Sequence, residues 1–218
     1  MVTASHLVKK ALSENSFLLE AISKDLISYG NLAEQLKPEI EQELGKKVKD
    51  SAIVMALRRY AEELQSFDKK IKKFGFKGEI IMRTNIMDFN VIKSSSLLNK
   101  IKNLYSLVDF ERGDTLNIIL GSNEVSIVAN EKYREKISTF LKGEKIIKKE
   151  FDLVALSIIF DTKDFISTPG VIFTAIRKLA WEQINIFEIV STMTEMTFVL
   201  SKKDSMRAYN ALQELVRK

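Results

Sequence analysis

The spacing of apolar residues divides the chain into a helical first part and a mixed second part. From Phe17 to Leu26, and again from Ile53 to Leu64, apolar side chains recur every three or four residues, the period of a helix with one buried face. We therefore predict a bundle of short helices over residues 1–66. From Glu79 onward, short apolar runs typical of strands alternate with helical patterns.

Residues that begin or end helices mark boundaries within the first part. Asn31 is a typical N-cap, so a short helix is predicted after it, and Pro38 either kinks this helix or begins another. Gly45 suits a C-terminal cap, and Asp50 suits the N-cap of the next helix. The lysine-rich stretch 67–78 is predicted to be a linker, or the end of a helix that becomes one.

The second part repeats one order of elements. Its first half is predicted to contain strand 79–92, helix 94–105, strands 115–120 and 125–129, helix 132–141 and strand 146–151. Its second half is predicted to contain strand 154–161, helix 169–181, strands 186–192 and 196–200 and helix 205–217, with no last strand. The predicted fold is α+β, a helical bundle followed by two ferredoxin-like βαββαβ repeats, 79–151 and 152–218.

Composition narrows the classes of function. The chain is 45% hydrophobic and 29% charged, which is typical of a folded protein. It has no cysteine and a single histidine, His6, which excludes disulfides, thiol nucleophiles, zinc knuckles and iron–sulfur clusters. Apolar runs are too short to span a membrane, and no apolar leader is present at the N-terminus. We expect a cytoplasmic protein that is not an enzyme and needs no cofactor, metal or membrane.

Basic residues are concentrated enough in the first part to raise the question of DNA binding. Up to Lys73 there are 13 basic and 11 acidic residues. The helix predicted from residue 51 would present a polar face preceded by lysines, and Glu62 and Glu63 near its end would repel DNA. The candidate DNA-binding residues are Lys46, Lys47, Lys49, Ser51, Met55, Arg58 and Arg59. A solvated surface explains the same pattern, so both interpretations stay open.

The second repeat resembles an ACT domain, a small-molecule-sensing module attached to aspartokinases and other amino-acid enzymes. The resemblance rests on Pro169-Gly170-Val171 at the start of a helix, the run INIFEIVST that enters the next strand, and the hairpin TEMTFVL. The first repeat is similar but degenerate, with three serines from Ser94 where Pro-Gly is expected. The helical part is similar to helix-turn-helix segments found with such domains in small archaeal regulators.

This resemblance implies a ligand site between the loop before the helix and the second strand of a partner domain. A helix N-terminus suits a carboxylate, hydroxyl groups can add donors, and acidic side chains can hold an ammonium group. The candidate ligand-binding residues are Asp161, Asp164, Ser167, Thr168, Pro169, Gly170, Val171, Asn185 and Ile186. The expected ligand is an amino acid or a related small metabolite.

Together these features predict a sensor that responds to a metabolite and regulates transcription. A repeat without its last strand would leave an open sheet edge, which a second copy can cover, so a homodimer or higher homo-oligomer is expected. The alternative is a regulatory partner protein whose helical part docks on an enzyme or a transporter without binding DNA.

Overall fold

The computed structural model describes residues 3–74, 76–161 and 164–216, and it divides into two compact units, Met1–Phe74 and Gly75–Lys218. We call them the helical unit and the sheet unit, and each is described by itself. The helical unit contains α1 (Ala4–Ser13), α2 (Ser16–Ser23), α3 (Tyr29–Leu44) and α4 (Asp50–Phe74).

The helices of the helical unit bury one face each in a common core. Leu12 of α1, Ile22 of α2, Ile40 of α3 and Leu57 of α4 are fully buried. Along α4 the apolar positions predicted to face the core are buried (Ile53, Leu57, Ala61) or half-buried (Val54, Tyr60, Leu64), and Ala56 is buried with them. Met55 and its neighbours at three- and four-residue spacing are exposed. The predicted helical bundle is confirmed.

Two details of this bundle differ from the prediction. The N-cap of α3 is Ser28, whose hydroxyl accepts the backbone N–H of Asn31, and the helix continues through Pro38 to Leu44. The helix begins earlier than predicted, and Ser28 is therefore its N-cap in place of Asn31. Serine, like asparagine, offers the side-chain oxygen that an N-cap needs. Gly45 adopts the predicted left-handed C-cap (φ 66°). Helix α4 extends to Phe74, through most of the predicted linker.

The sheet unit contains six strands in the order β2-β3-β1-β4-β6-β5, and every neighbouring pair is antiparallel. The strands are β1 (Gly78–Ile92), β2 (Leu116–Leu120), β3 (Glu124–Asn130), β4 (Ile146–Phe160), β5 (Ile186–Ser191) and β6 (Glu195–Ser201). The helices are α5 (Ser95–Ile101), α6 (Arg134–Phe140), α7 (Asp164–Ser167), α8 (Val171–Trp181) and α9 (Ser205–Val216), with short 3-10 turns at Tyr105–Leu107, Phe110–Arg112, Glu131–Tyr133 and Lys202–Asp204. This confirms the α+β class.

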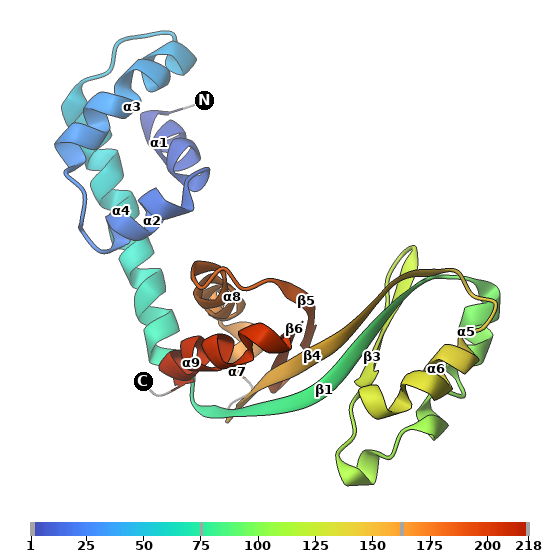
Figure 1. Cartoon of the computed structure of the whole chain (residues 1–218). Coiled ribbons are helices and arrows are strands. Elements are labelled where there is room, and N and C mark those ends of the chain that lie inside the picture. Colours follow the sequence, from blue (N-terminus) through green and yellow to red (C-terminus); the bar gives the residue numbers. More distant parts are fainter. Residues whose placement is uncertain (1–2, 75, 162–163, 217–218) are drawn as a thin grey trace. The chain divides into compact units, whose positions relative to one another are not determined.

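Strands β1 and β4 run side by side across the whole sheet unit (Figure 1). The end of β1 pairs with β3, whereas its beginning, residues 78–83, pairs with the end of β4 from Phe160 back to Ala155. The beginning of β1 therefore supplies the outer strand of the second half. The described part of residues 152–218 contains no last strand, as predicted, but the open sheet edge inferred from this was wrong because β1 covers it. Strand pairing between distant segments leaves no local signal in the sequence.

Strand β4 replaces two predicted strands. Residues 146–160 form one continuous strand, and Asp152 has a positive φ of 52° within it. On the neighbouring strand, Asn85 also has a positive φ, 56°, where the register between β1 and β4 shifts. These irregularities bend the two long strands without ending them. In the sequence, the short polar interruption at Asp152 resembles a turn, and for this reason the sequence predicts two strands in place of one.

The first half of the sheet unit has a hydrophobic core, and a second cluster joins the two halves. Phe89 of β1 and Ile127 of β3 pack with Leu97 of α5 and Ile137 of α6. Figure 1 shows α5 and α6 at one end of the long strands and α8 and α9 at the other. The joining cluster contains Ile86, Val128, Leu153, Ala155 and Val199, with Phe187 packed against it. The two halves thus form one body.

Within the described ranges, none of the helices is both long enough and apolar enough to cross a membrane.

Candidate functional site

The loop between β4 and α8 carries most of the predicted ligand-binding residues. Asp161 ends β4 with an exposed side chain, and its backbone N–H donates to the carbonyl of Lys77 (3.0 Å). Gly170 is the N-cap of α8 in a left-handed conformation (φ 88°), and no side chain caps this helix. The carbonyl of Gly170 accepts the N–H and the hydroxyl of Thr174. Gly170 itself has no side chain that could cap the first N–H groups of α8.

The other residues of this loop differ in exposure. Pro169 and Ser167 are exposed, Thr168 is half-buried and Val171 is buried at the start of α8. The side chain of Asp164 lies outside the described part of the chain. This arrangement places hydroxyl groups and a carboxylate, from Asp161, on the segment that leads into α8.

The predicted site has a second part, Asn185 and Ile186, which lies at the other end of the strands. Ile186 pairs with Leu200, which pairs with Val154 near the middle of β4, whereas the loop begins after Phe160. Six residues of strand separate the two positions, about 20 Å. One copy of the chain therefore does not bring Asn185 to the loop, and a site that uses both needs a second unit.

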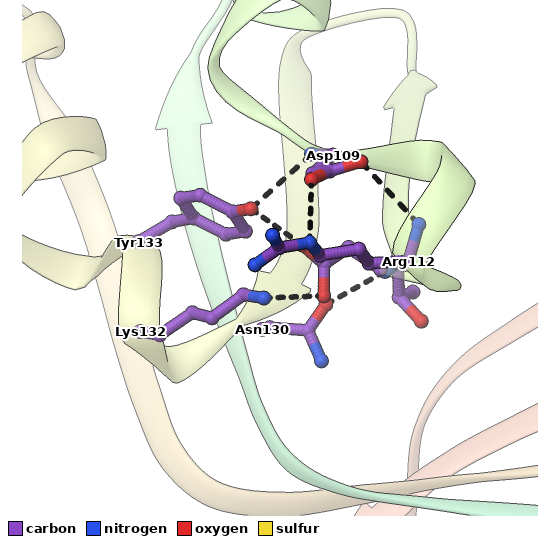
Figure 2. A network of polar contacts seen from close by, with 7 residues as sticks. Asp109, Arg112, Asn130, Lys132 and Tyr133 are labelled. Atoms are coloured by element: carbon purple, nitrogen blue, oxygen red, sulfur yellow. Dashed lines mark hydrogen bonds and ion pairs between the residues drawn. The ribbon is translucent and has the colours of Figure 1, made fainter.

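A polar network that sequence reasoning missed lies in the first half of the sheet unit. Lys132 forms an ion pair with Asp114 (2.6 Å), and Tyr133 donates its hydroxyl to the same carboxylate. Figure 2 shows Lys132 and Tyr133 beside Asn130, which accepts the backbone N–H of Thr115. The hydrogen bonds from Lys132 and Tyr133 lower the pKa of Asp114.

This network borders an open cavity of about 420 Å³. Its lining residues are Thr84, Asn85, Asp114, Asn130, Glu131 and Lys132. Glu131 accepts the backbone N–H of Asp152 (2.6 Å), so its carboxylate is also engaged. The charges of the cavity thus pair with groups of the protein itself, and the network ties the segment before β2 to the end of β3. No spacing motif connects these residues, which explains why the sequence did not reveal them.

Two carboxylates approach each other where the two halves of the sheet unit meet. Asp88 of β1 is 1% exposed and accepts hydrogen bonds from Ser126 and Asn90, both at 2.8 Å. Burial raises its pKa. Glu188 of β5 lies beside Ser126, and its pKa is also raised, by burial and by the negative charges of Asp88 and Glu124. Both acids therefore hold a proton to a higher pH than usual.

The predicted DNA-binding residues are all exposed in the helical unit. Lys46, Lys47 and Lys49 are exposed in the turn between α3 and α4. Ser51, Arg58 and Arg59 are exposed on α4, and Met55 between them is 53% exposed.

Acidic groups lie close to the predicted DNA-binding lysines. Asp50 forms an ion pair with Lys37 (2.8 Å), and Glu41 accepts the backbone N–H of Val48 (2.8 Å). Both carboxylates therefore stand at the turn that carries the three lysines. The predicted cations are thus exposed on the turn and on α4, with carboxylates beside the lysines.

Comparison with known proteins identifies the fold of the sheet unit. No protein-family model and no curated protein sequence matches the chain. Among solved structures, the aspartokinase alpha and beta subunits match over 64% of this chain and 97% of theirs, at 17% identity and a TM-score of 0.52. The sheet unit has the fold of an aspartokinase regulatory domain.

Two further structures support this assignment. The regulatory subunit of aspartate kinase from Thermus flavus matches over 64% of this chain and 97% of its own, at 16% identity and a TM-score of 0.52. The ligand-free regulatory subunit from Thermus thermophilus matches over 62% and 95%, at 15% identity and a TM-score of 0.50. Both of these structures are regulatory subunits and not catalytic ones. The predicted resemblance to ACT-type domains is therefore confirmed at the level of the fold.

Proposed function

We propose that this protein is a regulatory protein that senses an amino acid or a similar small metabolite with its sheet unit. The observation that carries the proposal is the fold, which matches nearly the full length of aspartate kinase regulatory subunits. The two halves of the sheet unit are interpreted as two ACT-like repeats, near 79–151 and 152–218, that exchange strand pairing through β1 and β4.

The ligand site is proposed to form between two copies of the chain. Strand β5 is an edge strand and runs parallel to β4, since both are antiparallel to β6. A two-fold axis that pairs β5 with its copy makes the two β5 strands antiparallel. The beginning of one β5, with Asn185 and Ile186, then lies beside the end at which the other copy's loop leaves β4. Exposed apolar side chains on β5 and α8, including Ile189 and Phe173, support such a contact.

The chemistry of this shared site suits a zwitterion. The N–H groups at the start of α8 attract a carboxylate, and Gly170 lets the ligand approach the backbone closely. Hydroxyl groups of Ser167 and Thr168 belong to the same segment. The carboxylate of Asp161 is placed to hold the ammonium group, and the amide of Asn185 can bind either end.

A thermal-shift screen over the twenty amino acids tests the proposed function. A ligand at a hundred times its dissociation constant adds about 2.7 kcal/mol to the free energy of unfolding, so at least one amino acid is expected to raise the Tm clearly. Amino acids that do not fit serve as controls of the same ionic strength. Uniformly flat shifts would remove the support for an amino-acid sensor.

The output is proposed to be transcriptional, through the exposed surface formed by the turn 46–49 and the first half of α4. In a dimer, ligand binding would change how far apart two such surfaces lie, and hence which spacing of DNA half-sites they fit. A second candidate is a regulatory subunit whose helical unit docks on an enzyme. The acidic groups beside the lysines and the regulatory-subunit neighbours favour this candidate.

A further inference from the structure

The side chain of Glu144, in the loop between α6 and β4, is held by three donors from a distant segment. The hydroxyl of Ser94 donates to Oε2 (2.8 Å) and that of Ser96 to Oε1 (2.8 Å). The ammonium group of Lys100 lies 2.7 Å from Oε1. The Glu144 side chain is only 5% exposed. A single carboxylate is therefore enclosed by two hydroxyl groups and one cation.

These contacts keep the carboxylate ionised. The hydrogen bonds from Lys100, Ser96 and Ser94 lower the pKa of Glu144 to about 2. The donors are themselves positioned by the backbone, since Ser94 Oγ accepts the N–H of Leu97 (2.9 Å) and Lys100 also donates to the carbonyl of Lys142 (3.1 Å). The three donors thus converge on one point with a geometry that suits a carboxylate.

We propose that Ser94, Ser96 and Lys100 form a carboxylate-binding cradle and that Glu144 is its tethered ligand. The cradle occupies the place in the first half that the loop before α8 occupies in the second. Both segments follow the first long strand of their half, Ser94 after the end of β1 and residues 161–170 after the end of β4.

The tethered carboxylate determines what the first half leaves for a free ligand. In the first half the protein's own carboxylate fills the cradle. This cradle is then closed to the carboxylate of an effector. This last statement rests on the proposed sensing function, but the cradle and its tethered carboxylate do not.

The experiment removes the tethered ligand and replaces it with a free one. Glu144→Ala is unfolded thermally in sodium acetate and in sodium chloride of equal concentration. The acetate ion is expected to bind the vacated cradle, so that at ten times its dissociation constant the ratio of folded to unfolded protein rises about elevenfold over that in chloride. The unaltered protein, whose cradle is full, is expected to show no such difference.

A second variant separates this effect from a general effect of acetate. Lys100→Ala combined with Glu144→Ala lacks the cation of the cradle and is expected to lose the acetate response. Equal Tm values of Glu144→Ala in both salts, or an acetate effect that persists in the double variant, would overturn the proposal. If Glu144→Ala does not fold in chloride, the yield of refolded protein is compared between the two salts, and equal yields overturn the proposal as well. An acetate response without any amino-acid binding would leave the cradle standing and contradict only the sensing function.

Discussion

Replacing Gly78 with alanine is expected to destabilise the sheet unit by about 3 kcal/mol or more. Gly78 pairs with Phe160 at the point where β1 meets the end of β4. A Cβ atom at this position would lie 1.9 Å from the backbone oxygen of Ile159 and 3.1 Å from Cα of Phe160. Both contacts are with backbone, so the strands themselves would have to separate. Urea denaturation followed by circular dichroism measures the change.

Gly143→Ala is the matched control for this substitution. Gly143 also has a positive φ, 86°, but an added Cβ atom would meet nothing within 4 Å. Its cost is the conformational one alone, about 1 kcal/mol. Equal destabilisation by the two substitutions would mean that residues 78–83 do not pair with β4. It would contradict the statement that β1 supplies the outer strand of the second half.

Removing both arginines of the exposed α4 surface is expected to weaken binding to duplex DNA about tenfold or more. Arg58 and Arg59 are exposed in the first half of α4, where a helix that enters the major groove by its N-terminal end makes its contacts. Each arginine that neutralises a phosphate also contributes about 0.9 to the slope of log affinity against log salt concentration. Fluorescence anisotropy with labelled duplex DNA at several salt concentrations measures both quantities for the Arg58→Ala, Arg59→Ala variant.

The control removes the same charge from another helix of the helical unit. Lys9 and Lys10 of α1 form ion pairs with Glu63 and Glu43, so their replacement by alanine removes two positive charges that carboxylates already neutralise. This variant is expected to bind DNA nearly as the unaltered protein does. No binding by the unaltered protein, or equal weakening by both double variants, would reject the DNA-binding surface and favour the regulatory subunit.

The sequence predicted those parts of the fold that depend on local patterns. The buried and exposed faces of α4 follow from apolar spacing alone, and the strand–helix order of the sheet unit follows from the change of period after Glu79. The pairing of residues 78–83 with β4 depends on segments more than 70 residues apart, and so no local pattern contains it. Asp152 interrupts an apolar run and has a positive φ within the strand. Aspartate is a residue type common in loops, so the sequence resembles a turn at this position.

The sequence predicted which residue types form the candidate site, but not where these residues lie in the fold. The sequence indicates the Pro169-Gly170 start of a helix and the Asn185 strand entry, but only the strand register shows that the loop follows the end of β4 whereas Ile186 lies level with the middle of that strand. The cradle around Glu144 and the paired acids Asp88 and Glu188 join residues 44 or more positions apart. Each of these residues is ordinary within its own segment, and only the sheet topology brings them together.

Effector binding by mixed dimers tests the shared site most directly. Asp161→Ala and Asn185→Ala alter exposed side chains, and each is expected to weaken binding of the amino acid found in the screen by about tenfold or more. When the two variants are denatured together in equal amounts and refolded, half of the dimers are mixed, and each mixed dimer has one intact site. Isothermal titration calorimetry is then expected to recover about a quarter of the original sites at the original affinity. Unchanged binding by the single variants, or no recovery in the mixture, would contradict a site built from two copies of the chain.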